Sequence, residues 1–240
     1  MFRSTPHIVV QRIEGRAPLS TFLGVSVVFG AVLAMAAVYT FAAPAVPVLV
    51  FALAVMICSY ALVQSYPHPV LGLCNVVTLF RVAMVAFLVG AVLAPATSAW
   101  LVFGVAVAAF ALDGVDGWLA RRTGLVSDFG ARFDMETDAG LGAVISLWLL
   151  SSGVAGPEVL VLGFMRYAFF GASFVWPALQ APLPEALRRK AICVVQIAAL
   201  ILLIFPWTPQ AAVLPTVLGT TLLLGWSFLI DILWLSRRAA

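Results

Sequence analysis

The sequence predicts an all-α, polytopic integral membrane protein with about eight transmembrane helices. Of the 240 residues, 64% are hydrophobic and only 10% are charged, and the mean hydropathy is +1.13. A soluble globular domain is about 45–50% apolar and about 25% charged, so these few charges could not cover a water-soluble surface. Because one transmembrane helix takes about 20 apolar residues, the length leaves no room for a separate soluble domain.

Eight apolar runs, separated by polar residues or by proline and glycine, predict the helices. Each run must be helical, because a backbone in lipid has to satisfy its own hydrogen bonds. The weakest divisions lie near residues 43–46 and 94–97, where only proline and small residues indicate a turn. The expected helices are 21–43, 47–65, 75–94, 97–120, 131–152, 156–177, 190–205 and 211–236.

The basic residues predict the orientation. With eight spans, four basic clusters fall on one side of the membrane, and the opposite loops contain no lysine or arginine. By the positive-inside rule this side is cytoplasmic and holds both termini. We expect an integral protein of a bacterial inner membrane, oriented in this way. The clusters are Arg3, Arg12 and Arg16; Arg121 and Arg122; Arg188, Arg189 and Lys190; and Arg237 and Arg238.

Acidic residues concentrate between residues 113 and 138. Asp113 and Asp116 are three apart near the end of the fourth predicted helix, and Asp134 and Asp138 are four apart at the start of the fifth. Each pair therefore shares one helix face. Since the turn between these helices returns the chain to the same membrane side, the two pairs can converge.

Four carboxylates close together at membrane depth would repel one another and be poorly solvated. Two divalent cations would relieve both penalties, and oxygen ligands suit Mg²⁺, Mn²⁺ or Ca²⁺. Two such ions favour displacement at phosphorus. The alternative is a set of solvated charges at a turn between helices. Two nearby acids are expected to lie outside this group of four carboxylates. Glu136 lies about 200° around the helix from Asp134, and Asp128 is expected in the loop.

Two glycines and an arginine flank these carboxylates. Gly117 follows Asp116 directly, and Gly130 is expected at the start of the next helix. A glycine at such a position lets a phosphate or sugar approach the backbone closely. Arg121, one turn from Gly117, could pair with a phosphate or serve as a positive-inside anchor.

The whole pattern, D-x2-D-G-x2-A-R-x8-G-x3-D-x3-D, resembles the signature of the CDP-alcohol phosphatidyltransferases, including the phosphatidylglycerophosphate synthases. The chain matches it at every fixed position, namely Asp113, Asp116, Gly117, Ala120, Arg121, Gly130, Asp134 and Asp138. Eight fixed positions are far more specific than an ordinary short motif.

Asn75, Thr78 and Arg81 add a weaker likeness, to the N-x2-T-x2-R opening of the family core. Asn75 could instead simply cap its helix. The resemblance divides the chain into an N-terminal tail with two extra transmembrane helices (residues 1–74) and a six-helix core (residues 75–240). The family indicates no role for the two extra helices.

The resemblance implies transfer of a phosphatidyl group from a CDP-linked donor such as CDP-diacylglycerol to a polar alcohol, with release of CMP. By likeness, Asp113, Asp116, Asp134 and Asp138 bind two divalent cations, Mg²⁺ or Mn²⁺, and Asp138 is also the general base. The resemblance further implies a homodimer. The implied CDP-binding residues are Asn75, Thr78, Asp113, Gly117, Ala120, Arg121 and Gly130.

An anionic acceptor such as glycerol 3-phosphate would require additional positive charge. The candidates are Arg132, Arg166, Arg188, Arg189 and Lys190. The last three could equally form a topology anchor or a patch for lipid headgroups. Arg166, near the middle of a predicted helix, could instead neutralise a buried acid. Asp231 is expected to form a surface ion pair with the nearby Arg237 and Arg238.

Two alternative functions stay open at this point. A CDP-choline or CDP-ethanolamine phosphotransferase acting on a lipid alcohol would use the same motif. An ion or solute transporter is less favoured, because its path would need polar residues toward the outer side, where the sequence is almost wholly apolar. We expect membrane lipids, but no nucleic acid, among the partners.

Overall fold

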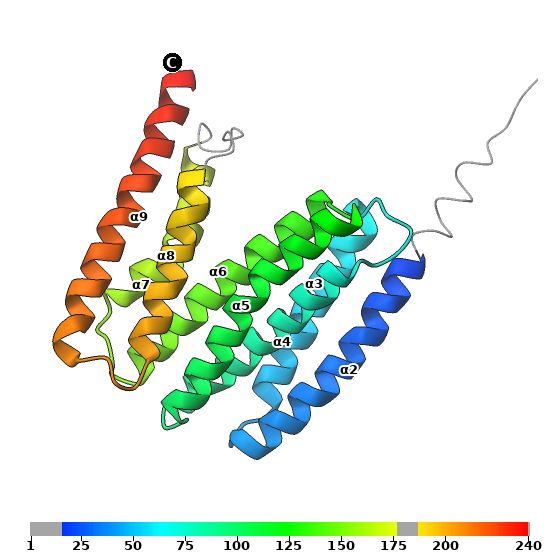
Figure 1. The fold of residues 1–240 in the computed structure, drawn as a ribbon, viewed down its shortest axis with the longest axis horizontal. Helices are drawn as coiled ribbons and strands as arrows, with labels where there is room; N and C mark the ends of the chain where they lie inside the picture. Colours follow the sequence, from blue (N-terminus) through cyan, green and yellow to red (C-terminus); the bar gives the residue numbers. More distant parts are fainter. Residues whose placement is uncertain (1–15, 177–186, 240) are drawn as a thin grey trace, which may run out of the picture. The chain divides into compact units, whose positions relative to one another are not determined.

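The computed structural model describes residues 16–176 and 187–239, and the regular secondary structure of this part of the chain is helical, without strands (Figure 1). Each of the eight predicted helices is present, with ends within five residues of those expected. Arg3 and Arg12 of the N-terminal tail lie outside the described residues. The helices are α2 (Arg16–Thr40), α3 (Ala45–Ser65), α4 (Leu73–Leu93), α5 (Ala99–Thr123), α6 (Asp128–Ser151), α7 (Val159–Val175), α8 (Leu187–Ile204) and α9 (Gln210–Ala239).

Five of these helices, α2, α3, α4, α5 and α9, are long and apolar enough to cross a membrane by length and composition. Helix α7 is apolar but has only 17 residues. Helices α6 and α8 both begin with several charged residues, which shortens their apolar stretches. The predicted class, an all-α polytopic membrane protein, is confirmed. The orientation of the termini stays a prediction.

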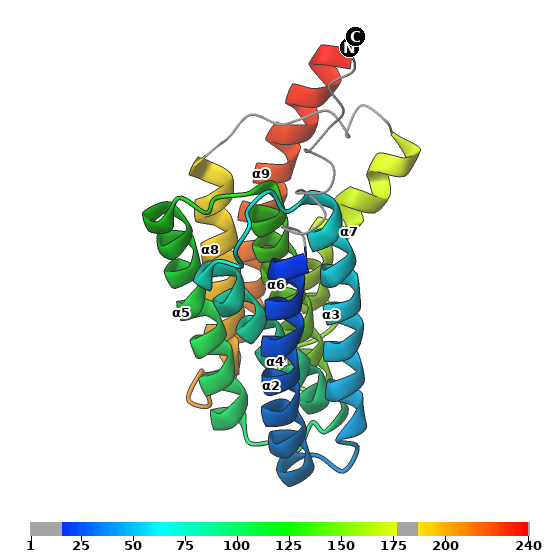
Figure 2. The same cartoon turned by 90° about the vertical axis from the view of Figure 1, so that its right-hand side faces the viewer.

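The chain divides into two compact units, and the first contains Met1–Gly90 and Ala108–Asp138. Here α2 packs against α3, and the two helices run side by side in Figure 2. Phe41, just after α2, contacts Phe87 of α4 with ring centroids 4.8 Å apart, and Phe22 of α2 lies edge-on to Phe133 of α6 at 6.2 Å. The N-terminal helices therefore pack directly on helices of the predicted core.

The second unit contains Ala91–Val107 and Ala139–Ala240, and in it α9 packs against α7 and α8. Asp231 of α9 is buried, and its Oδ1 lies 2.6 Å from Arg188 Nη2 and 3.3 Å from Arg189 Nη1, both on α8. The expected surface position of Asp231 was therefore wrong, because the packing of α8 on α9 encloses it. The side chains of Arg237 and Arg238 lie outside the described residues.

A short turn joins α5 to α6. Gly124 adopts a positive φ of 69°, and the Leu125 N–H donates to the Ala120 carbonyl, which ends α5 in the way typical of a C-terminal glycine. Ser127 caps α6, because its Oγ accepts a hydrogen bond from the Gly130 N–H at 3.0 Å. Asp128, expected in the loop, is instead the exposed first residue of α6.

Candidate metal and nucleotide site

Helix α4 has a polar stripe along one face. Asn75, Thr78 and Arg81 follow one another at intervals of three residues, so that they lie on the same side of the helix. All three are buried, and Arg81 has an exposed fraction of 0%. Polar groups buried in an otherwise apolar membrane helix are stable only where they are paired, so their partners identify the site.

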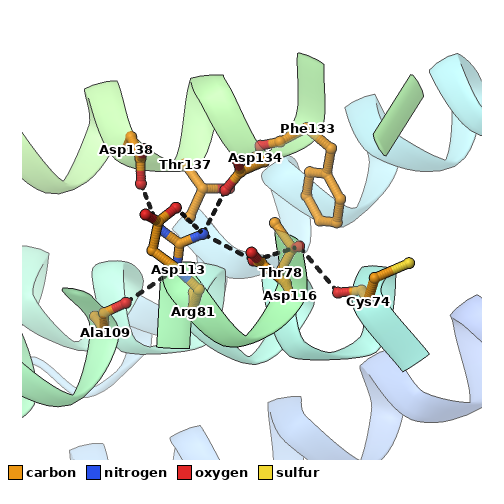
Figure 3. A network of polar contacts seen from close by, with 10 residues as sticks. All are labelled: Cys74, Thr78, Arg81, Ala109, Asp113, Asp116, Phe133, Asp134, Thr137 and Asp138. Carbon is orange, nitrogen blue, oxygen red and sulfur yellow. Dashed lines mark hydrogen bonds and ion pairs between the residues drawn. The ribbon is translucent and has the colours of Figure 1, made fainter. Parts of the chain in front are cut away.

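The partners of this stripe include the two predicted carboxylate pairs. One carboxylate oxygen from each of Asp113, Asp116 and Asp134 lies within 4.8 Å of the others. Asp138 is outside this group of three but contacts the same guanidinium. Figure 3 shows Arg81 between the side chains from α5 and those from α6. The predicted convergence of the two acidic faces is therefore present in the first unit.

Arg81 forms ion pairs with all four aspartates. Its Nη1 lies 3.3 Å from Asp113 Oδ1 and 2.9 Å from Asp116 Oδ2, and it also pairs with Asp134 Oδ1. Its Nη2 pairs with Asp138 Oδ1, and its Nε donates to the Ala109 carbonyl at 3.0 Å. One side chain of α4 thus holds together the carboxylates of α5 and α6.

The role of Arg81 was missed from the sequence, which placed it only in the weak opening motif. The available signal was an arginine within the predicted membrane span 75–94. Such a charge normally faces the protein interior and pairs there. The spacing of Asn75, Thr78 and Arg81 on one face then indicates the direction in which its partners lie.

The carboxylates retain capacity for additional cations. One guanidinium faces four carboxylates, which leaves three formal negative charges. The Oδ2 atom of Asp116 accepts from Thr78 Oγ1 at 3.0 Å and from Arg81 Nη1. Its Oδ1 atom is buried and accepts no hydrogen bond from any described residue. A buried carboxylate oxygen without a partner is unfavourable, and a divalent cation is the partner that this all-oxygen set suits.

Exposure differs sharply within the cluster. The side chain of Asp116 is 4% exposed, whereas those of Asp134 and Asp138 are 36% and 35% exposed. The cluster therefore has a closed wall at Asp116 and Arg81 and an accessible side at α6. A phosphate-containing ligand could reach this side without unfolding the helices.

Two glycines lie where the signature predicts a close approach. A Cβ atom at Gly130 would lie 3.3 Å from Asn75 Oδ1 and 3.2 Å from Ser127 Oγ, so the glycine allows α6 to start beside α4. A Cβ atom at Gly117 would lie 3.3 Å from Nη1 of Arg121, whose exposed side chain folds back over the glycine. Ala120, one turn from Asp116, is half-buried.

The candidate acceptor residues are distributed over both units. Arg132, on α6, is exposed and belongs to the unit with the aspartates. Arg166 lies on α7, and Arg188, Arg189 and Lys190 lie at the start of α8, all in the second unit. Arg188 is engaged with Asp231 and with the Ser227 carbonyl at 2.7 Å. Lys190 is exposed.

Comparison with known families assigns most of the chain. Residues 71–230, two-thirds of the sequence, match the family described as CDP-alcohol phosphatidyltransferase. The match starts just before α4, ends within α9 and includes all four aspartates of the cluster. No curated protein matches the chain.

Proposed function

Since the chain belongs to the CDP-alcohol phosphatidyltransferase family, we propose that it transfers a phosphatidyl group from CDP-diacylglycerol to a small polar alcohol and releases CMP in phospholipid biosynthesis. The observation that carries this proposal is the carboxylate cluster with its buried, unpartnered Asp116 Oδ1. Glycerol 3-phosphate is the acceptor to test first.

Two divalent cations, Mg²⁺ or Mn²⁺, would be bound by Asp113, Asp116, Asp134 and Asp138. When bound, such cations screen the pyrophosphate of the donor and stabilise the negative charge that develops on CMP. The unsatisfied charge of the cluster supports this assignment, because Arg81 alone neutralises only one of the four carboxylates.

Asp138 is the proposed general base. The acceptor hydroxyl oxygen forms a bond to the phosphorus of the phosphatidyl group, the bond from that phosphorus to the CMP oxygen breaks, and the hydroxyl proton moves to the Asp138 carboxylate. Arg81 pairs with Oδ1 of Asp138, which orients the carboxylate and leaves Oδ2 to accept the proton. The partial exposure of Asp138 supports access by a polar acceptor.

The donor nucleotide would bind beside the metals. The proposed contacts are Asn75, Thr78, Asp113, Gly117, Ala120 and Gly130, and Arg121 would pair with a phosphate. The exposed Arg121 side chain next to Gly117 supports this role, since it can swing away from the glycine without breaking a buried contact.

An anionic acceptor would meet the positive charge of Arg132, Arg166, Arg189 or Lys190. Arg188 and Arg189 are the weaker candidates, because both already pair with Asp231 and Arg188 also donates to the Ser227 carbonyl. We further propose that the enzyme is a homodimer in a bacterial inner membrane, with both termini and the active site on the cytoplasmic side. The charge distribution of the sequence supports this orientation.

The test is an assay of the purified protein with radiolabelled CDP-diacylglycerol, Mn²⁺ or Mg²⁺ and a panel of acceptors. Release of CMP should require both an acceptor and a divalent cation, and Asp138→Asn should abolish it. Asp128→Asn is the matched control, because Asp128 is an exposed aspartate of the same helix outside the signature. Absence of CMP release with every acceptor and both metals would refute the proposal.

A further inference from the structure

Two prolines restrict the backbone of the segment between the extra helix α3 and the core helix α4. Tyr66 and His68 each precede a proline, and a residue before proline is restricted to extended conformations. Tyr66 follows this rule with φ −86° and ψ 118°, and its N–H still donates to the Leu62 carbonyl at 3.0 Å. Helix α3 therefore ends at Ser65, and the backbone of Tyr66, from which the side chain extends, is held in this extended conformation.

The hydroxyl of Tyr66 has three partners. It donates to the Val70 carbonyl at 2.9 Å and accepts from the Gly72 N–H and from Asn75 Nδ2, both at 3.3 Å. A tyrosine hydroxyl has one donor and two acceptor positions, so its capacity is used in full. Burial raises the pKa of Tyr66, which keeps the donor proton in place.

This arrangement fixes the orientation of the Asn75 amide. With Nδ2 directed to Tyr66, Oδ1 faces the first turn of α6, where a Cβ atom at Gly130 would lie only 3.3 Å from it. Rotating the amide would place its oxygen against the Tyr66 oxygen, two acceptors facing each other. Asn75 consequently presents a hydrogen-bond acceptor toward α6.

The segment is also attached to the turn between α5 and α6. The Tyr66 ring lies edge-on to Phe129 of α6 at 5.7 Å and to His68 at 5.4 Å, and His68 Nε2 lies 3.1 Å from the Val126 carbonyl. Residues 66–72 thus connect the start of α4 with the turn that precedes Gly130. The ring contact with Phe129 restrains Tyr66 independently of α4.

We infer that Tyr66 is a positioning residue of the nucleotide site, which holds Asn75 so that the asparagine carbonyl accepts a hydrogen bond from the cytidine nucleotide. The inference rests on the proposed function. It would give the N-terminal part of the chain a role, because the segment that follows α3 supplies the residue that orients the first polar side chain of the core.

The experiment compares Tyr66→Phe with the wild-type enzyme in the CMP-release assay. This substitution removes the hydroxyl and keeps the ring contacts with Phe129 and His68. The KM for CDP-diacylglycerol and the inhibition constant of CMP should both rise by about two- to tenfold, which corresponds to the loss of one hydrogen bond, while kcat stays within about twofold. Tyr60→Phe is the matched control, since Tyr60 lies exposed on α3.

A double-mutant cycle tests whether Tyr66 acts through Asn75. Asn75→Ala should raise the same two constants, and adding Tyr66→Phe in that background should change them little further. Additive effects would overturn the inference, as would an unchanged KM in an active Tyr66→Phe enzyme, or a fall in kcat and melting temperature with KM unchanged. A wild-type enzyme that releases no CMP would instead refute the proposed function itself.

Discussion

Replacing Arg81 with methionine should make the stability of the protein depend on divalent cations. The substitution removes the fixed positive charge but retains a long apolar side chain in a fully buried position. Removing one partner of a buried ion pair costs about 3–5 kcal/mol. Because three of the four carboxylates are about one-third exposed and can be partly hydrated, we expect the lower end, about 3 kcal/mol.

For a chain of this size, about 3 kcal/mol corresponds to a decrease in melting temperature of about 6–12 °C. Thermal unfolding of the detergent-solubilised protein, first in EDTA and then with increasing Mn²⁺, measures this decrease. Mn²⁺ should raise the melting temperature of Arg81→Met more than that of the wild type, because the added cation then replaces the missing charge. Arg122→Met is the control, since Arg122 is exposed and lies over the Trp118 ring at 4.9 Å.

Two results would contradict this reasoning. If Arg81→Met melts at the wild-type temperature in EDTA, the guanidinium does not hold the carboxylates together. If Mn²⁺ raises the melting temperature of both proteins equally, the cation and Arg81 do not neutralise the same charges. A loss of stability of the same size in Arg122→Met would indicate a general effect of removing a cation.

Two glycines give simpler tests of packing and of the site. Gly90→Ala should destabilise the protein by about 1–3 kcal/mol, because the added Cβ would lie 2.5 Å from the Phe41 ring. Gly104→Ala should be neutral in the same melting experiment, because no atom lies within 4 Å of the added Cβ. Gly117→Ala should leave the melting temperature within about 1 °C of wild type, because the added Cβ would lie 3.3 Å from only the flexible end of the Arg121 side chain. It should raise the KM for CDP-diacylglycerol several-fold, because it displaces that guanidinium. An unchanged KM would show that Arg121 and Gly117 do not belong to the proposed nucleotide site.

Much of this architecture could be predicted because the membrane restricts the choice of structure. An apolar run in lipid must be helical, so run lengths alone gave eight helices with ends close to those observed. The spacing of Asp113 with Asp116 and of Asp134 with Asp138 gave two acidic faces. Because the turn between the two helices is short, it places these two faces close together.

The partners of these faces could not be predicted in the same way. Helical periodicity states which side chains share a face, but not which face of another helix lies opposite. Arg81 contacts aspartates up to 57 positions away in the sequence, and Asp231 pairs with arginines 42 and 43 positions away. Tyr66 likewise could not be singled out from the sequence, because its contact with Asn75 depends on how the two prolines direct the chain.

Under the proposed function, the negative charge of the site would be neutralised partly by a permanent cation, Arg81, and partly by exchangeable metal ions. Nε of Arg81 is committed to the Ala109 carbonyl, so among the guanidinium donors only the N–H groups of Nη1 and Nη2 remain for the carboxylates, and Asp116 Oδ1 receives none of them. A cluster with several arginines would be neutral and would have no need of metal. A cluster without any would push α5 and α6 apart whenever metal dissociates, because like charges at these distances repel strongly in a poorly solvated environment. Under the proposed function, a single buried arginine would avoid both outcomes: it would keep the carboxylates together between catalytic cycles and would leave them enough negative charge to bind divalent cations with the next substrate.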